Sequence, residues 1–490
     1  MSAQVLISGA GPVGMTLAVE LTRLGVPVRI IDKSPGRTGK SRALVLWSRS
    51  LELFEPSGLA ERFVATGNPV THTTFMEGQK PIGTFRLDQL ESPYAYALMV
   101  PQTETERLLE AHLAESGIRI ERNTTLLDFE QDGAGVTARL LSETGEIETL
   151  NTPWLVGCDG AHSAIRHQLG LAFEGYAEPV EWALADVYLP DSVPGDQLQV
   201  SLHPAGVLAL FPMGQHRFRL IADLGVAEAG PDTSELTLAQ LQAMIDARGR
   251  PDLVARDPQW LSRFRINERK VADYRKGRIF LAGDAAHIHS PAGGQGMNTG
   301  MQDAFNLAWK LALVVKGAAK EALLDTYSPE RSPIAELVLR NAGGGTKAVT
   351  LSNPLARSTR NFVLGAALKI PAVQRRVGKF LSELDVAYPK SPLSVTGEED
   401  APSIGVKPGQ RVGSEIFGIS QQQIGQSGKW ILIGSTEDVT AIAAEFPALV
   451  DAAQERREPG LWLVRPDGYL GFAGAAGDVA GARNYLRRIA

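Results

Sequence analysis

The feature that most constrains this fold is a glycine-rich turn that joins a strand-like run to a helix-like run near the N-terminus. Val5-Leu6-Ile7-Ser8 has the apolar character of a buried strand and leads into Gly9-Ala10-Gly11-Pro12-Val13-Gly14. The apolar spacing of the next residues, closed by Gly25, predicts a helix. Val28-Arg29-Ile30-Ile31 predicts a second strand, which ends at Asp32. Elements in this order form the βαβ unit of a Rossmann-like α/β fold.

The spacing of this motif also favours a dinucleotide ligand. Gly9, Gly11 and Gly14 lack Cβ atoms, so backbone amides can approach a pyrophosphate closely. Asp32 follows about 20 residues later, where an acidic side chain binds a ribose hydroxyl in such folds. A purely structural βαβ connection is the less favoured alternative, and the motif by itself leaves FAD and NAD(P) open.

A second strand-to-glycine transition occurs at Gly283-Asp284, after the apolar run 278–282. A glycine-rich loop then leads through Gly296, Met297 and Asn298 into an amphipathic helix, which we expect to begin at about Asn298 with Thr299 and Gln302 as a capping box. The free amides and positive dipole end of such a helix favour an anionic group. Taken alone, such a stretch is more often an ordinary connection between a strand and a helix than a ligand site.

A third strand ends in the same way, at Cys158-Asp159-Gly160. Cys158 is predicted to be a small buried residue of that strand, since no base is visibly positioned to activate it. Arg42 and Gln102 stand in loops next to predicted helices. Arg42 is interpreted as a phosphate ligand or a surface charge, and Gln102 as a ligand or a helix cap.

Composition excludes several classes of function. The chain has 49 Lys and Arg against 55 Asp and Glu, a net charge of -6, and no basic run, so we expect no nucleic-acid partner. A single cysteine excludes intramolecular disulfides and cysteine metal clusters, and His287 and His289 lack further ligands, so no metal is expected. No targeting segment or long apolar stretch stands out, so we expect a cytoplasmic protein without a membrane partner.

In this order and spacing, the three motifs resemble those of the class A flavoprotein monooxygenases, the FAD-dependent aromatic hydroxylases. The resemblance covers residues 1 to about 385 and includes Ser41-Arg42-Ala43 and Pro101-Gln102. It implies that FAD is bound and that Asp32 stands where the family more often has Glu. It implies that the FAD pyrophosphate is bound by Gly9, Gly11, Gly14 and Arg42 and that the ribose is bound by Asp32. The ribityl chain would be bound by Gln102 and Asp284, and the flavin edge would face Gly296, Met297 and Asn298. Asp159 would serve both FAD binding and the passage of NAD(P)H.

The resemblance further implies a reaction. NAD(P)H, with NADPH favoured, reduces FAD, O₂ adds to give a flavin C4a-hydroperoxide, and one oxygen is transferred to a phenolic ring. The C-terminal region favours a polycyclic aromatic polyketide or antibiotic as substrate. A simple or halogenated phenol is the alternative within the class, and a flavin-dependent reductase or dehydrogenase is the alternative outside it. No residue is identified as the base that activates the substrate.

The predicted domain order is a FAD-binding domain, interrupted by an inserted antiparallel sheet that binds substrate, followed by a small C-terminal module. Alternating apolar residues between Tyr176 and Tyr274 predict that sheet, in which Phe211 and Met213 are the candidate pocket residues. The module resembles a thioredoxin-like domain without a Cys-x-x-Cys motif, so its expected role is packing or homodimer formation. The expected boundaries are 1–175 and 276–388 for the two parts of the FAD-binding domain, 176–275 for the substrate domain, 389–408 for a linker and 409–490 for the thioredoxin-like domain.

Overall fold

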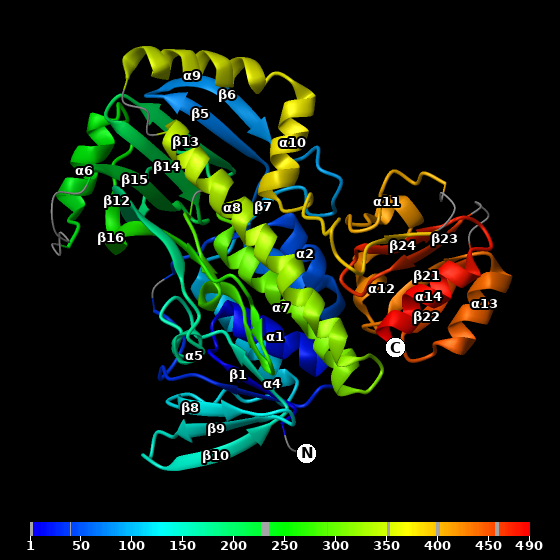
Figure 1. Ribbon diagram of the computed structural model, residues 1–490. Helices are drawn as coiled ribbons and strands as arrows, with labels where there is room; N and C mark the ends of the chain where they lie inside the picture. Colours follow the sequence, from blue (N-terminus) through cyan, green and yellow to red (C-terminus); the bar gives the residue numbers. More distant parts are fainter. Residues whose placement is uncertain are drawn as a thin grey trace.

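The computed structural model describes residues 3–39, 41–226, 235–291, 293–349, 353–397, 402–455 and 460–490. A long central helix, α7 (Gly296–Val315), separates a parallel sheet from a small α/β module, and a larger sheet lies at the opposite end of the molecule (Figure 1). No helix within these ranges is long and apolar enough to cross a membrane. The expected linker at 389–408 includes residues 398–401, which lie outside the described residues.

The parallel sheet joins strands from distant parts of the sequence. Its order is β17-β18-β11-β1-β2, in which β17 is an antiparallel edge strand. The strands are β1 (Val5–Ser8), β2 (Val28–Ile31), β11 (Trp154–Gly157), β17 (Arg275–Lys276) and β18 (Ile279–Leu281). The predicted βαβ unit is present, with α1 (Pro12–Arg23) between β1 and β2. Because parallel strands end at one edge, the turns that follow β1, β11 and β18 lie side by side.

The larger sheet has the order β19-β16-β12-β15-β14-β13-β5-β6. Its strands are β5 (His72–Glu77), β6 (Lys80–Arg86), β12 (Glu174–Tyr188), β13 (Gln197–His203), β14 (Gly206–Pro212), β15 (Arg217–Val226), β16 (Arg256–Lys270) and β19 (His287–Ile288). Most neighbours are antiparallel, as predicted, but β13 pairs with β5 in parallel. The sheet therefore also contains a hairpin that precedes the predicted insertion, and α6 (Leu238–Ala247) packs beside it.

Two three-stranded sheets complete the N-terminal part, in the orders β10-β9-β8 and β3-β7-β4. Their strands are β3 (Val45–Leu46), β4 (Asn68–Val70), β7 (Ala97–Met99), β8 (Thr125–Gln131), β9 (Val136–Leu141) and β10 (Ile147–Thr152). Besides α1, the α-helices of this part are α2 (Ser48–Phe54), α3 (Leu59–Thr66), α4 (Gln102–Glu115) and α5 (Ala164–Gln168).

The start of α7 differs from the prediction. The helix begins at Gly296, earlier than expected, and Thr299 and Gln302 do not form a capping box. Instead, Thr299 Oγ1 donates a hydrogen bond of 2.8 Å and Gln302 Nε2 one of 2.6 Å to the two carboxylate oxygens of Glu383. The prediction of a capping box was wrong because Glu383, a buried acceptor distant in sequence, accepts hydrogen bonds from both side chains.

Among the described residues, three more α-helices follow α7 before the C-terminal module: α8 (Tyr327–Val349), α9 (Pro354–Ala367) and α10 (Pro371–Leu381). Helices α9 and α10 pack against β6 and lie over the end of the larger sheet (Figure 1).

The C-terminal module is a five-stranded sheet of order β20-β24-β23-β21-β22. Its elements are β20 (Val395–Thr396), α11 (Ser414–Phe417), α12 (Gln421–Gly425), β21 (Trp430–Gly434), α13 (Thr436–Glu445), β22 (Val450–Glu455), β23 (Leu461–Val464), β24 (Leu470–Gly474) and α14 (Val479–Ile489). Trp430 stacks edge-to-face on Trp309 of α7, with ring centroids 5.1 Å apart. The module thus shares a buried core with the parallel-sheet region.

A fully buried group of charges joins the module to the rest of the chain. Glu330 of α8 accepts hydrogen bonds from Arg465 Nη1 at 2.7 Å and Nη2 at 2.9 Å. Lys310 of α7 donates a third, at 2.7 Å. None of these three side chains is exposed to solvent. Because a buried charge is costly when it loses its partner, these contacts couple the module to α7 and α8.

Candidate functional site

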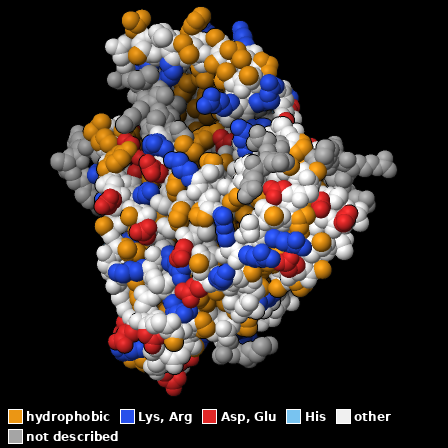
Figure 2. All heavy atoms as spheres, turned by 45° about the vertical axis from the view of Figure 1, so that its right-hand side comes forward, with side chains coloured by type: hydrophobic (Ala, Val, Ile, Leu, Met, Phe, Trp, Pro, Cys, Tyr) orange, Lys and Arg blue, Asp and Glu red, His pale blue; other side chains and the backbone are white. Residues whose placement is uncertain are grey.

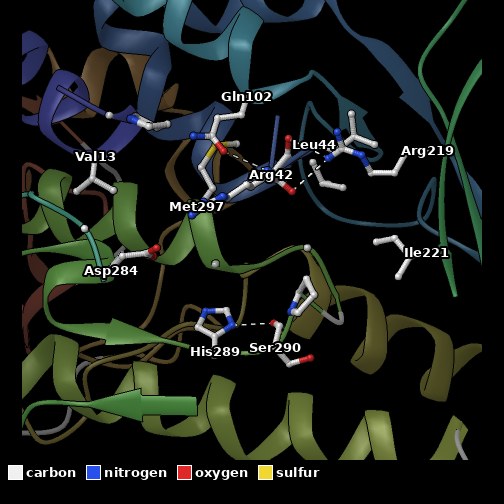
Figure 3. Close-up of a pocket in the computed structure, with 18 of the residues that line it drawn as sticks. Val13, Arg42, Leu44, Gln102, Arg219, Ile221, Asp284, His289, Ser290 and Met297 are labelled. Atoms are coloured by element: carbon white, nitrogen blue, oxygen red, sulfur yellow. Dashed lines mark hydrogen bonds between the residues drawn. The ribbon is translucent and has the colours of Figure 1, made fainter. Parts of the chain in front are cut away.

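One pocket brings together residues from all three sequence motifs. It has a volume of about 340 Å³ and lies at the edge where β1, β11 and β18 end, facing strands β14 and β15 (Figure 3). The predicted site residues that line it are Gly11, Arg42, Gln102, Phe211, Asp284, Gly296 and Met297. The predicted residues outside its lining are Gly9, Gly14, Asp32, Asp159, Met213 and Asn298.

The glycine turn has different requirements at its three glycines. A Cβ atom on Gly9, whose φ is +105°, would lie 2.3 Å from the carbonyl oxygen of Cys158, and one on Gly14 would lie 1.9 Å from that of Gly9. Both positions therefore require glycine so that β1, α1 and β11 can pack closely. At Gly11 a Cβ atom would meet nothing within 4 Å, so this glycine leaves space on the pocket side. The first turn of α1 has no side-chain cap, which leaves its amides available to a ligand.

Asp32 lies in a second hollow, also about 340 Å³ in volume, that shares Gly11 with the first. Its carboxylate accepts hydrogen bonds from the backbone amides of Ala10 at 2.7 Å and Ser34 at 2.8 Å. These bonds hold the carboxylate beside the glycine turn. Each oxygen can still accept a further bond from a ribose hydroxyl.

Arg42 and Gln102 both line the main pocket. The Gln102 amide is held at both ends, since Oε1 accepts from the Ala43 amide at 3.1 Å and Nε2 donates to Glu106 at 2.9 Å. Gln102 therefore also fixes the loop that carries Arg42. The Arg42 side chain is exposed toward the pocket (Figure 3).

The two aspartates that follow β11 and β18 have different surroundings. Asp284 stands in the pocket, where the enclosing protein partly desolvates its carboxyl group and raises the pKa. Asp159 lies outside the lining, and its Oδ2 accepts from the Ala164 amide at the start of α5, at 2.8 Å. Its Oδ1 is buried and has no hydrogen-bond partner. An unpaired buried carboxylate oxygen is costly, so a donor from a bound group would stabilise it.

The N-terminus of α7 also contributes to the wall of this pocket. Gly296 and Met297 line the pocket, and no side chain caps the helix. The side chain of Asn298 turns away from the pocket: Oδ1 accepts from the Trp47 amide at 2.9 Å, and Nδ2 donates to the Val45 carbonyl at 2.9 Å. Its side chain thus ties α7 to β3, while the backbone amides of the first turn remain uncapped.

The larger sheet contributes Phe211, Arg219 and Ile221 to the pocket. Met213 does not line it and packs in an apolar cluster beside Phe211. Arg219 was missed by the sequence analysis. It is buried and makes paired hydrogen bonds of 2.8 and 2.9 Å to Asp186, its cross-strand neighbour, and Nη1 donates to the Arg42 carbonyl at 3.2 Å. The available signal was a pair of opposite charges, each flanked by apolar residues, in two predicted strands of the same sheet.

His289 was also missed as a pocket residue, since the sequence analysis considered it only as a possible metal ligand. It lines the pocket, its Nδ1 donates to the Ser290 carbonyl at 3.0 Å, and burial lowers its pKa to about 4 (Figure 3). The His289 ring is therefore neutral near pH 7. His287 is buried behind it, and its Nε2 donates to Asp303 at 2.7 Å. Within the described residues, no group of three His, Cys, Asp or Glu side chains could hold a metal.

Taken together, these features fit a flavin dinucleotide. Open space at Gly11, two uncapped helix N-termini, a carboxylate beside the glycine turn and an unpaired oxygen at Asp159 match a long anionic ligand that donates hydroxyl groups. The site and the split α/β architecture fit an FAD-binding flavoprotein.

Comparison with known proteins gives the family. Residues 2–342 match the FAD binding domain family, and the chain belongs to this family. Together with its relatives, this makes the chain an FAD-dependent aromatic monooxygenase. The chain is 38% identical to 6-methylpretetramide 4-monooxygenase from Streptomyces rimosus, over 96% of this chain and 90% of that protein. It is also similar to the structure of the OxyS anhydrotetracycline hydroxylase from Streptomyces rimosus, with a TM-score of 0.79, 30% identity and coverage of 100% and 99%. A ternary complex of aklavinone-11 hydroxylase with FAD and aklavinone gives a TM-score of 0.78 at 26% identity, with coverage of 99% and 98%.

Proposed function

We propose that this enzyme uses NAD(P)H and O₂ to hydroxylate a polycyclic phenol of the aromatic polyketide type. The observation that carries the proposal is a single pocket whose one side is formed by Gly11, Asp284 and Met297 and whose other side is formed by Phe211 and Ile221. A flavin held by the first group would face an apolar molecule held by the second. Relatives that match nearly the whole chain are named for tetracycline-type and rifampicin substrates, which supports a large ring system.

Bound FAD would pass electrons from NAD(P)H to O₂, and O₂ would supply the oxygen atom that is transferred, with the other oxygen leaving as water. The chain would supply position, electrostatics and exclusion of water. The amides and dipole of the first turn of α7 would favour negative charge at the flavin edge next to Met297. Asp284 would accept hydrogen bonds from ligand hydroxyl groups, and Asp32 would accept those of the ribose.

Arg219 has a positioning role in this scheme. Its pair with Asp186 fixes the guanidinium, which in turn holds the carbonyl of Arg42 on the loop between the flavin side and the substrate side. Because the His289 ring is neutral, this side chain would add no positive charge to the part of the pocket that it lines. No residue is assigned as the base for the substrate.

The predicted domain division belongs to the same proposal. In the C-terminal module, β21, α13 and β22 form a parallel βαβ unit, and β23, β24 and α14 follow as a hairpin and a helix. This order supports a thioredoxin-like domain, and with Cys158 as the only cysteine of the chain it would act in packing or in homodimer formation. We also propose that the protein is located in the cytoplasm.

The test is a panel of polycyclic, simple and halogenated phenols, assayed for stimulated NAD(P)H oxidation and for products by mass spectrometry under labelled O₂. The expected result is one labelled oxygen in a polycyclic product. Labelled product from monocyclic phenols alone would favour the simple-phenol alternative. NAD(P)H oxidation that continues without O₂ in the presence of another electron acceptor, with no hydroxylated product, would favour a reductase.

A further inference from the structure

The outer side of α9 and α10 carries exposed apolar side chains that no described segment covers. Phe362 is 79% exposed, Leu355 77%, Val363 55% and Ile370 50%. Leu355, Phe362 and Val363 are seven and eight residues apart on α9, so they share one side of the helix. We call this surface, together with the exposed Lys369, Arg375, Arg376 and Val377, the α9–α10 face.

The inner side of the same two helices is fixed to the larger sheet. Leu368 packs over Gly83 of β6, and Gln374 Oε1 accepts a hydrogen bond of 3.0 Å from the Arg86 amide. Arg357 donates to the Pro204 carbonyl at 3.2 Å. The helices are therefore held in place on one side, and their outward apolar residues are not needed for that packing.

The charge of this segment is one-sided. Residues 353–381 contain six basic residues and no acidic residue, although the whole chain has a net charge of -6. The basic residues are Arg357, Arg360, Lys369, Arg375, Arg376 and Lys379. Figure 2 shows apolar side chains along the top of the molecule, over α9, with Lys and Arg side chains next to them. An amphipathic helix with basic residues beside exposed Leu and Phe has the composition of an interfacial helix.

We propose that the α9–α10 face docks the enzyme on the surface of an anionic lipid bilayer. The apolar side chains would enter the headgroup boundary, and the cations would pair with anionic headgroups. A second copy of the chain fits less well, because a two-fold contact places Lys369, Arg375 and Arg376 on both sides of the interface. A membrane partner was not expected from the sequence because no long apolar stretch stood out, but a helix pair that lies on the membrane surface needs no such stretch.

The inner residues of α9 and α10 connect the α9–α10 face with the substrate side of the pocket. Leu368 and Leu381 belong to the apolar cluster that also contains Phe211 and Met213, at the substrate side of the pocket. If the proposed function holds, docking would place this side of the molecule next to the bilayer, where apolar aromatic compounds partition.

Co-sedimentation of the FAD-loaded full-length enzyme with vesicles tests docking without any assay of activity. We expect binding to vesicles of phosphatidylcholine and phosphatidylglycerol in equal parts, weaker binding at high salt, and no binding to phosphatidylcholine alone. Each Lys or Arg near an anionic surface contributes about fivefold, so Arg375→Gln with Arg376→Gln should weaken binding about 30-fold. Phe362→Ser with Val363→Ser should weaken it at least about tenfold.

Matched controls make the same changes elsewhere on the surface. Arg487→Gln with Arg488→Gln removes two exposed cations of α14, and Ile147→Ser removes an apolar side chain that is 55% exposed on β10. Both should bind vesicles like the wild type, and FAD content should be equal in all variants. Equal binding to neutral vesicles, equal loss in the controls, or a dimer that Phe362→Ser with Val363→Ser dissociates in the absence of vesicle binding would each overturn the proposal.

Discussion

Glu383 offers a direct test of how the start of α7 is held. Glu383 is 2% exposed, and burial raises the pKa of its carboxyl group from 4.5 to about 8, with Arg331 opposing and Asp385 and Asp303 adding to the shift. The folded chain therefore takes up a proton at Glu383 that the unfolded chain has lost between these two pH values. The stability that Glu383 contributes is complete below about pH 4.5 and is lost as the pH rises through about 8.

The perturbation is Glu383→Gln, which keeps the shape and needs no proton. Its carbonyl can accept from Gln302 and its NH₂ group can donate to Thr299 Oγ1, so both contacts survive. At about 1.4 kcal/mol for each pKa unit, the wild type should lose about 3–4 kcal/mol relative to the variant between pH 5 and pH 8.

Urea unfolding followed by tryptophan fluorescence, at pH 5 and pH 8, measures this difference. Glu91→Gln is the comparison, because the hydrogen bond from Lys379 lowers the pKa of that carboxyl group and its smaller effect should have the opposite direction. A difference between Glu383→Gln and wild type that is the same at both pH values would refute the reasoning.

Three further predictions concern the pocket and the C-terminal module. Asp284→Ala should weaken FAD binding at least about tenfold, measured by flavin fluorescence on titration, and stoichiometric yellow enzyme would contradict its role. Phe211→Ala should raise KM for the aromatic substrate while FAD affinity stays unchanged; a loss of flavin instead would move Phe211 to the cofactor side. Arg465→Met leaves Glu330 with Lys310 as its remaining cation, and should lower the free energy of unfolding by about 3–5 kcal/mol in urea titrations, whereas an unchanged midpoint would show that the buried charges are not coupled.

Local sequence patterns predicted the elements that carry the glycine motifs. The βαβ unit and the strands before Asp159 and Asp284 are present because each is specified by nearby residues: an apolar run, a glycine turn and a helix pattern. The parallel order then places their ends together without further information.

Contacts between distant segments were not predictable in this way. Thr299 and Gln302 satisfy a local rule for helix caps, yet Glu383 captures both because it is a buried acceptor within reach. Ile118-Arg119-Ile120 has strand character but does not form a strand, and only Glu121 beside it makes an isolated bridge to Ile31. The hairpin of β5 and β6 joins the larger sheet through a parallel pairing that no turn signal encodes.

The pocket residues that sequence reasoning missed share this cause. Arg219 depends on Asp186, which is its partner only through the pairing of β12 with β15. His289 follows the Gly283-Asp284 turn closely in sequence, but its neutral state results from burial, which the sequence pattern does not indicate.

The buried charges at Glu330 have a practical consequence for protein engineering. Because Arg465 of the module pairs with Glu330 of α8 and Glu330 also holds Lys310 of α7, the carboxylate and its two cationic partners lie on three separate segments of the chain. A chimaera that exchanges residues 409–490 alone would unite a donor from one enzyme with an acceptor from another. Chimaeras between family members should therefore fold only when Arg465, Glu330 and Lys310, or the residues at these three positions in the other enzyme, are transferred together.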